Sequence, residues 1–308
     1  MNGLGTSAIS TAAFADKSAA STDDMARTAV TVDAVRDILV HLDGSTQDLA
    51  NLAHAEMIAT VFSAHVRGVI THAIPAALVT LEPELERLSA AFWQNDAALF
   101  DKAEAQARQR LLLLGAGTDL LRIDGMSHEL GRAVAQFARA VDLVIMGRPY
   151  GGSSRWPDLL ESVLFDAGAP AFVVPPEASH PKDPDRILIG WRDTTECSHA
   201  IAAALPFLKN AERVFLVEVR ETNSADPRAS PPAADMARHL ARHGIAIEVR
   251  SVANGTSPAD GLLNEAALVG AELIVIGAYG RSRLREFLLG GVTRDLLTKS
   301  VVPLLMAH

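Results

Sequence analysis

The sequence predicts an α/β protein made of two tandem doubly wound parallel sheets, each with five strands. Three observations carry this prediction. The length of 308 residues suits two domains, 49 % of the residues are apolar while only 5 % are aromatic, and the chain contains an internal repeat. Abundant Ala, Leu and Val suit helices packed on buried parallel strands, and the apolar fraction lets each half bury a core.

The repeat opens with two short apolar runs, at residues 37–42 and 186–191. Each run predicts a strand, and each is followed by a small hydroxyl residue, Ser45 or Thr194. Such residues cap helices by accepting backbone N–H bonds. Apolar residues spaced three and four apart then predict a half-buried helix after each strand.

Later landmarks recur in the same order. Residues 142–147 and 272–277 predict buried strands that end on glycine, and residues 169–174 and 302–306 predict last strands opened by proline. The remaining strands are expected at residues 68–72, 119–123, 213–219 and 246–252. Each half therefore alternates strands with helices, which implies parallel sheets covered on both faces.

These landmarks predict the domain organisation. We expect a first domain at residues 36–176 (the first half), a Pro-rich linker at 177–184 and a second domain at 185–308 (the second half). Residues 1–35 are rich in Ala, Ser and Thr, and we expect a disordered or extended segment there, or a mis-chosen start codon.

The two halves differ in length between their first and fourth strands. The first half carries 19 extra residues, which fall around residues 82–114 in a charged, amphipathic helical stretch. The stretch is either a longer helix that covers the sheet, which we favour, or a surface for a partner protein.

Charge and cysteine content exclude several classes of function. The formal net charge is −9 and no basic stripe occurs, which argues against a nucleic-acid partner. Cys197 is the single cysteine, so no intramolecular disulfide can form and a reducing cytoplasm is the expected compartment. No apolar run approaches the roughly 20 residues that span a bilayer, so we expect no membrane segment.

A glycine-rich loop follows the fourth strand of the second half. Glycines let a backbone approach an anion, and the N–H groups at a helix N-terminus favour negative charge. Doubly wound sheets also bind ligands at the carboxyl ends of their strands. We predict a phosphate site lined by Gly277, Gly280, Arg281, Gly290, Gly291, Val292, Thr293 and Arg192. The alternatives are a tight turn that needs glycine without any ligand and, for Arg192, a plain surface arginine.

The spacing Gly277-x2-Gly280-x9-Gly290, with the strand-end landmarks, resembles the universal stress protein family. ATP-binding members of that family carry Gly-x2-Gly-x9-Gly followed by Ser or Thr. The resemblance runs from about Asp37 to the end and implies a Rossmann-like, adenine nucleotide alpha hydrolase-like fold. It also implies ATP or another adenine nucleotide as ligand, and a homodimer or a fused tandem, often paired through the last strands.

The second half departs from the family pattern at two positions. Gly291 stands where the family has a hydroxyl that contacts phosphate, although Thr293 is close by. Arg192 stands where ATP-binding members have an acidic residue at the end of the first strand, a position that Asp43 fills in the first half.

The first half has different defects. Its loop at residues 147–150 lacks the second glycine, and Pro149 removes a backbone donor. Glu161 and Ser162 stand where a phosphate would sit. We therefore expect a degenerate site in this half.

Two other signals receive structural interpretations. His239 and His243 have metal-ligand spacing, but Arg238 and Arg242 flank them and no third ligand is evident, so we expect a helix C-terminus and no metal site. Cys197 is expected to be a small packed residue, and no catalytic residue is assigned.

Three functions remain for the chain. The first is a stress-response sensor that binds an adenine nucleotide through the second half, with the two domains paired and a homodimer as a further expectation. The second is an interaction module without nucleotide. The third is a weak nucleotide hydrolase, ranked last because no base or metal cluster stands beside the loop.

Overall fold

The structure, a computed structural model, describes residues 34–74, 83–114, 119–150, 157–178, 180–220, 232–253, 257–278 and 291–308. Residues Val35–His308 form one compact unit. The segment predicted to be disordered or extended, residues 1–35, lies almost wholly outside the described residues. The domain boundaries at residues 176 and 185 stay a prediction.

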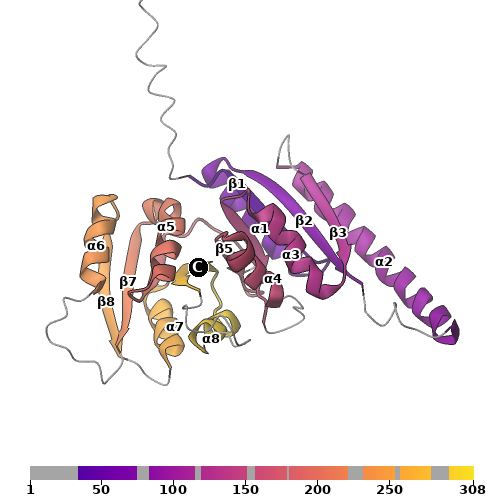
Figure 1. The fold of residues 1–308 in the computed structure, drawn as a ribbon. Helices are drawn as coiled ribbons and strands as arrows, with labels where there is room; N and C mark the ends of the chain where they lie inside the picture. The colour runs from indigo at the N-terminus through magenta and orange to yellow at the C-terminus, as the bar shows by residue number, and fades with distance from the viewer. Residues whose placement is uncertain are drawn as a thin grey trace, which may run out of the picture. The chain divides into compact units, whose positions relative to one another are not determined.

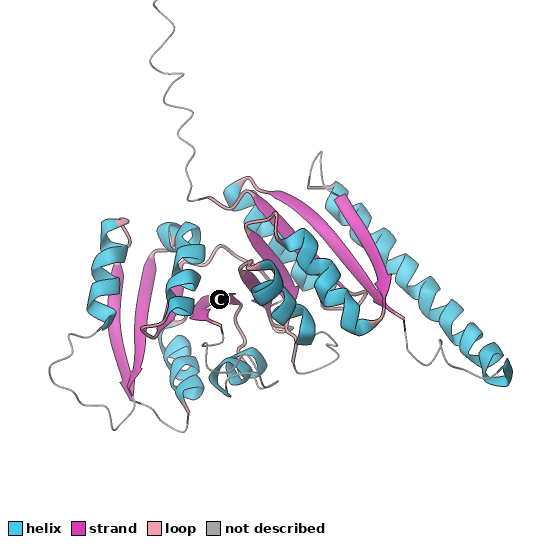
Figure 2. Ribbon diagram, viewed as in Figure 1, coloured by secondary structure: helices cyan, strands magenta, loops and turns pink. Residues whose placement is uncertain are grey.

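Strands and helices alternate along both halves (Figures 1 and 2). The first half contains β1 (Asp37–Leu42), α1 (Asp48–Phe62), β2 (His65–Ala73), α2 (Pro83–Leu112), β3 (Asp119–Gly125), α3 (Ser127–Ala138), β4 (Leu143–Gly147), α4 (Pro157–Glu161), the π-helix η3 (Ser162–Ala167) and β5 (Ala171–Val174). The second half contains β6 (Arg186–Trp191), α5 (Thr195–Asn210), β7 (Arg213–Arg220), α6 (Pro232–Arg242), β8 (Ile247–Ala253), α7 (Pro258–Val269), β9 (Leu273–Gly277), α8 (Gly291–Lys299) and β10 (Leu304–Ala307).

The strands form one ten-stranded sheet in the order β3-β2-β1-β4-β5-β10-β9-β6-β7-β8. Within each half the neighbours are parallel and the order is the same, outer strand to last strand, which confirms the predicted doubly wound repeat. The halves meet where β5 and β10 pair antiparallel, with Leu304 opposite Val173 and Met306 opposite Ala171. The two predicted sheets are therefore joined through their last strands.

The two faces of the sheet carry separate helix layers. Helices α1, α2, α5 and α6 supply one buried cluster, and α3, α4, α7 and α8 supply the other. Each cluster contains residues from both halves. Phe207 of α5 lies 5.1 Å from Phe62 of α1 and 6.0 Å from Phe172 of β5, ring centroid to centroid. The halves consequently share two continuous cores.

The predicted cap is confirmed in the second half and is wrong in the first. Thr194 accepts a hydrogen bond from the Cys197 N–H at 3.3 Å and begins α5. In the first half a longer turn follows β1, so α1 begins only at Asp48 and Gln47 occupies the cap position without a side-chain bond. Ser45 lies inside that turn and accepts from the Gln47 N–H at 3.3 Å.

The extra residues of the first half lie in a longer helix, as expected. α2 has 30 residues and its counterpart α6 has 11, which matches the 19 extra positions. Figure 1 shows α2 running beside β3, the outer strand of that half. In the part of the chain that the structure describes, no helix is both long and apolar enough to cross a membrane.

Candidate functional site

The second half brings three of the predicted site segments to one edge of its sheet. β6 and β9 are parallel neighbours, with Gly190 opposite Ile276, so the ends of both strands lie at the same carboxyl edge. Arg192 follows β6, and Gly277 is the last residue of β9. Ala278 follows β9, and the next described residue is Gly291, the first residue of α8. Gly280, Arg281 and Gly290 lie outside the described residues.

Gly277 is required by packing against α5. A Cβ at this position would lie 2.5 Å from the Cys197 backbone nitrogen and 2.7 Å from the carbonyl carbon of Glu196. The contacting atoms are backbone, so they cannot move aside as a flexible side chain would. This glycine therefore lets β9 pass the N-terminus of α5, whether or not a ligand is bound.

The N-terminus of α8 is open by comparison. A Cβ at Gly291 would meet nothing within 4 Å. Val292 is 37 % exposed, whereas Thr293 is buried. The first N–H groups of a helix have no partner within the helix, and the helix dipole adds partial positive charge there. Among the described residues, this end of α8 is therefore uncrowded at Gly291.

Two side chains at the end of β6 add donors to this edge. Arg192 is exposed. Trp191 is buried, and its indole N–H has no hydrogen-bond partner among the described residues. A buried donor without a partner is uncommon. Charge and donors thus gather at the carboxyl edge of the second half.

The corresponding turn of the first half is closed on itself. The Asp48 carboxylate accepts the N–H groups of Asp43 and Gly44 at 3.0 and 2.9 Å. Burial, followed by the negative charge of Asp43, raises the Asp48 pKa from its ordinary value of 3.8 to about 8, and these two bonds only partly oppose the shift. The donors that an anion would need after β1 are already used by this side chain.

The helix after β4 includes the two residues expected where a phosphate would sit. α4 begins at Pro157 and continues into η3, so Glu161 ends α4 and Ser162 begins η3. Both residues therefore lie inside a continuous helical segment. Burial and the neighbouring Asp158 raise the Glu161 pKa, which reflects a position where negative charge is unfavourable.

A buried polar pair lies near the end of β1 and β2. His41 Nε2 and Thr71 Oγ1 are 2.8 Å apart, and both residues are almost fully buried. Burial lowers the His41 pKa from 6.5 to about 4, so the imidazole is neutral near pH 7. A neutral imidazole paired with a hydroxyl suits a structural role on this face.

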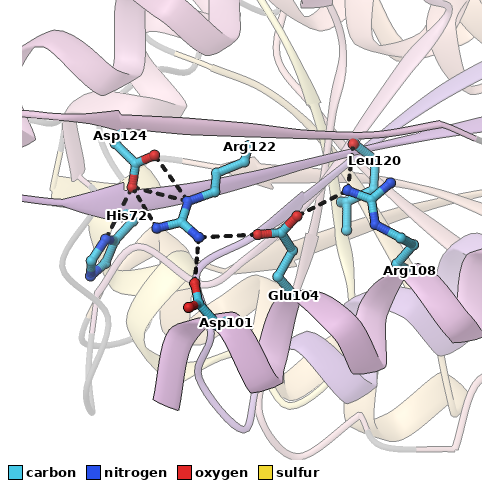
Figure 3. A network of polar contacts seen from close by, with 7 residues as sticks. All are labelled: His72, Asp101, Glu104, Arg108, Leu120, Arg122 and Asp124. Atoms are coloured by element: carbon cyan, nitrogen blue, oxygen red, sulfur yellow. Dashed lines mark hydrogen bonds and ion pairs between the residues drawn. The ribbon is translucent and has the colours of Figure 1, made fainter. Parts of the chain in front are cut away.

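A second polar network joins α2 to β3 (Figure 3). Arg122 of β3 donates to Asp101 at 2.6 Å and to Glu104 at 3.2 Å, both on α2, and to Asp124 at 2.9 Å. Asp124 also bonds His72 at 3.1 Å. These carboxylates raise the Arg122 pKa, and Arg122 and His72 in turn lower the Asp124 pKa although burial opposes that shift. The network fixes the extra helix on the outer strand.

Cys197, His239 and His243, which we interpreted as structural residues, pack against their own helices and strands. Cys197 is buried in the first turn of α5, with its Sγ 3.7 Å from the Gly190 carbonyl oxygen. α6 ends at Arg242, and Gly244 follows in the left-handed conformation at φ +80°. The rings of His239 and His243 pack on each other with centroids 4.8 Å apart. Within the described residues, no group of three or more His, Cys, Asp or Glu is arranged for a metal.

Sequence reasoning missed Arg148, His41 and Arg122. The first two had a readable signal, because each places a charged or ionisable residue within or directly after a buried strand. Arg148 stands where the second half has Ala278. The two partners of Arg122 in α2 lie 18 and 21 residues away, and no local pattern indicates them.

The comparisons with known proteins agree with this architecture. A sequence profile of the Universal stress protein family matches residues 184–308. No curated protein sequence is similar enough to count as a match.

Several solved structures have the same fold over most of the chain. A universal stress protein from Archaeoglobus fulgidus DSM 4304 is 14 % identical with a TM-score of 0.62, and the match covers 88 % of this chain and 97 % of the other. A Pseudomonas aeruginosa UCBPP-PA14 protein assigned to the universal stress proteins is 18 % identical, with coverages of 89 % and 94 % and a TM-score of 0.56. A functionally unknown protein from Pseudomonas aeruginosa PAO1 is 19 % identical, with coverages of 89 % and 93 % and a TM-score of 0.56. At these identities the likeness concerns the fold.

Proposed function

Residues 184–308 are a universal stress protein domain and the first half repeats its fold; from this premise we propose that the chain is a tandem stress-response sensor that binds an adenine nucleotide through its second half. ATP is the nucleotide we favour, because the Gly277-x2-Gly280-x9-Gly290 spacing resembles that of ATP-binding members. The cytoplasm remains the proposed compartment.

One observation carries the proposal. Arg192, the end of β9 at Gly277 and the open N-terminus of α8 at Gly291 belong to the carboxyl edge of the same small sheet. Ligands of doubly wound sheets bind at this edge, and phosphates favour helix N-termini. A nucleotide there would use the α8 N–H groups and the Arg192 charge.

Calorimetry with ATP tests the proposal on the full chain. We expect heat of binding at millimolar nucleotide, and weaker binding for Gly290→Val because a bulky side chain crowds the backbone approach to phosphate. Arg192→Ala should weaken binding about threefold, the effect of removing one exposed charge. Arg186→Ala is the matched control, since this exposed arginine lies at the opposite end of β6. Absence of heat and of any thermal shift with the wild type would contradict nucleotide binding.

A gain-of-function variant sharpens the test. Gly291→Ser restores the hydroxyl that the family has at this position, and the open space around Gly291 accepts the side chain. A hydrogen bond to a charged group contributes enough to tighten ATP binding about tenfold. Gly291→Ala is the control, because it adds the Cβ without the hydroxyl. Equal affinities for the two variants would show that phosphate does not lie at this helix end.

The first half favours a second candidate function, a partner-binding module. Its turn after β1 is closed by Asp48, and its loop after β4 contacts the second half through Arg148. Without any nucleotide, the first half can pair with the second half and offer a binding surface to a partner protein or to a second copy of the chain. ATP-independent capture of one defined partner by both wild type and Gly290→Val would favour this candidate. Phosphate release that Gly280→Val abolishes would instead indicate a hydrolase.

A further inference from the structure

Helix α8 reaches from the proposed nucleotide site to the first half. Because β5 and β10 are antiparallel, the strands of the two halves run in opposite directions, and their carboxyl edges lie on opposite sides of the joined sheet. α8 begins at Gly291 on the carboxyl edge of the second half and ends at Lys299, shortly before β10 starts. Its nine residues span about 14 Å at about 1.5 Å each.

Arg148 of the first half binds the far end of this helix. The side chain follows β4 and is 9 % exposed. Its Nη1 donates to the Thr298 carbonyl oxygen at 2.7 Å, and its Nη2 donates to the Ser300 carbonyl oxygen at 2.6 Å. Nη2 also donates to Glu177 Oε2 at 2.7 Å. One buried guanidinium thus holds two carbonyls of the other half.

The placement is favourable for electrostatic reasons. The last carbonyls of a helix have no partner within the helix, and they carry the negative end of its dipole. A buried cation that donates to them satisfies both requirements, and charge-assisted bonds are the stronger kind. Tyr150 adds a second contact from the same loop, since the Arg294 guanidinium lies 6.0 Å from its ring centroid.

In the described part of the second half, the position equivalent to Arg148 makes a different contact. Ala278 occupies the position of Arg148, and its carbonyl oxygen bonds the His308 ring at 3.0 Å. In the loop after β4, Tyr150 stands where the second half has Gly280, and Arg148 stands where it has Ala278 and docks on α8. This difference between the halves indicates that Arg148 acts at the junction of the two halves and not in a ligand site of the first half.

We propose that Arg148 is a positioning residue that fixes α8 from the first half and thereby couples nucleotide binding in the second half to the docking of the two halves. The coupling rests on the proposed function, whereas the docking role does not. Because coupling between two equilibria is reciprocal, bound nucleotide should strengthen the Arg148 contacts as much as those contacts strengthen binding.

The first experiment measures amide hydrogen exchange of the ligand-free full chain. Arg148→Met keeps the apolar stem and removes the donors, so exchange at residues 296–300 should become about tenfold faster. Arg148→Lys keeps the charge but lacks the two-pronged guanidinium, so its exchange rate at residues 296–300 should lie between those of wild type and Arg148→Met. Arg139→Met is the matched control, because Arg139 also donates to a carbonyl, that of Asp166 at 3.2 Å, but within its own half. Glu177→Gln should leave α8 unchanged.

The second experiment measures ATP affinity of the same variants and exchange with ATP present. Arg148→Met should weaken binding about fivefold, Arg148→Lys less, and Arg139→Met not at all. In the wild type, ATP should slow exchange around residues 147–150, which lie in the other half, and this protection should vanish in Arg148→Met. A merely stabilising residue would not transmit that signal.

The outcomes separate the two claims. Unchanged exchange of α8 in ligand-free Arg148→Met overturns the docking role whatever ATP does. Faster exchange with unaltered ATP affinity overturns the coupling and keeps the docking. A wild type that binds no ATP removes the proposed function and the coupling with it, while the ligand-free exchange still decides the docking role.

Discussion

At the scale of single residues, the two described glycines at the predicted phosphate site, Gly277 and Gly291, have different surroundings. Gly277 is enclosed by the backbone of α5, with a Cβ position 2.5 Å from the Cys197 nitrogen, whereas Gly291 faces open space. The first glycine therefore serves the fold, and only the second has room to serve a ligand. A motif match does not reveal this difference, because the spacing records only that Gly277 is a glycine and not what encloses it.

This contrast predicts unequal effects on stability. Gly277→Ala should lower the free energy of unfolding by about 3 kcal/mol, because the added Cβ overlaps backbone atoms and forces β9 away from α5. Gly291→Ala should change it by less than about 0.5 kcal/mol. Urea unfolding of both variants is the measurement, and similar losses would contradict the packing argument.

Asp48 predicts an unusual pH dependence. Its pKa is about 8 when folded and about 3.8 when unfolded, so between these values the folded chain holds a proton that the unfolded chain releases. Stability from this group is complete below about pH 4 and is lost as the pH rises towards 8. Asp48→Asn should therefore gain stability relative to wild type by up to about 1.4 kcal/mol per pH unit in this window.

Urea unfolding at pH 5 and pH 7 checks the Asp48 prediction. Asp119→Asn is the control, since Asp119 is an exposed carboxyl at the start of β3. The prediction fails if the difference in free energy of unfolding between Asp48→Asn and wild type is the same at both pH values. The Asp48 carboxyl group would then be ionised in the folded protein.

At the scale of elements, the two halves begin their first helices differently. Thr194 caps α5 directly, whereas the longer turn after β1 leaves Ser45 three residues before α1. Thr194→Ala should cost about 1 kcal/mol, the usual effect of removing a helix cap. Ser45→Ala should cost less than half of that. Equal losses in urea unfolding would show that Ser45 acts as a cap despite its position.

Much of the element order was predictable because it depends on local patterns. The buried strands are nearly continuous apolar runs, such as β4 and β9, and their glycine ends mark where the chain turns. The length of α2 was predictable from the charged, amphipathic stretch between β2 and β3. These features require only neighbours along the chain.

The candidate site was less predictable because its neighbours are distant in sequence. Arg148 meets carbonyls 150 and 152 residues away, and nothing near it indicates that contact. The start of α4 at Pro157 was not predicted from the sequence. The shared edge of Arg192 and Gly277 was predictable, since strand order alone brings it about.

At the scale of the whole molecule, the joint between the halves decides how the chain unfolds. We predicted two five-stranded sheets, and the structure has one continuous sheet of ten strands. A single undivided domain could also form such a sheet. The strand order distinguishes these cases, because the same five-strand order occurs twice, on either side of the antiparallel pair β5 and β10. Both buried clusters cross that joint.

The crossing cores predict a single unfolding transition for residues 35–308. Phe172 belongs to the first half and stacks with Phe207 of the second, so Phe172→Ala should cost about 3–5 kcal/mol and shift the whole transition without splitting it. Hydrogen exchange should speed up in α5 of the second half as well as in α3 of the first. Two separate transitions, or a loss of protection confined to the first half, would contradict a shared core.

The antiparallel joint also consumes both last strands. Two copies of a single five-stranded domain can associate by laying those strands together, and here the fusion has made that contact internal. The backbone groups still free for sheet extension belong to the outermost strands of the described sheet, β3 and β8. Any larger assembly that extends this sheet must therefore add its strand beside β3 or β8.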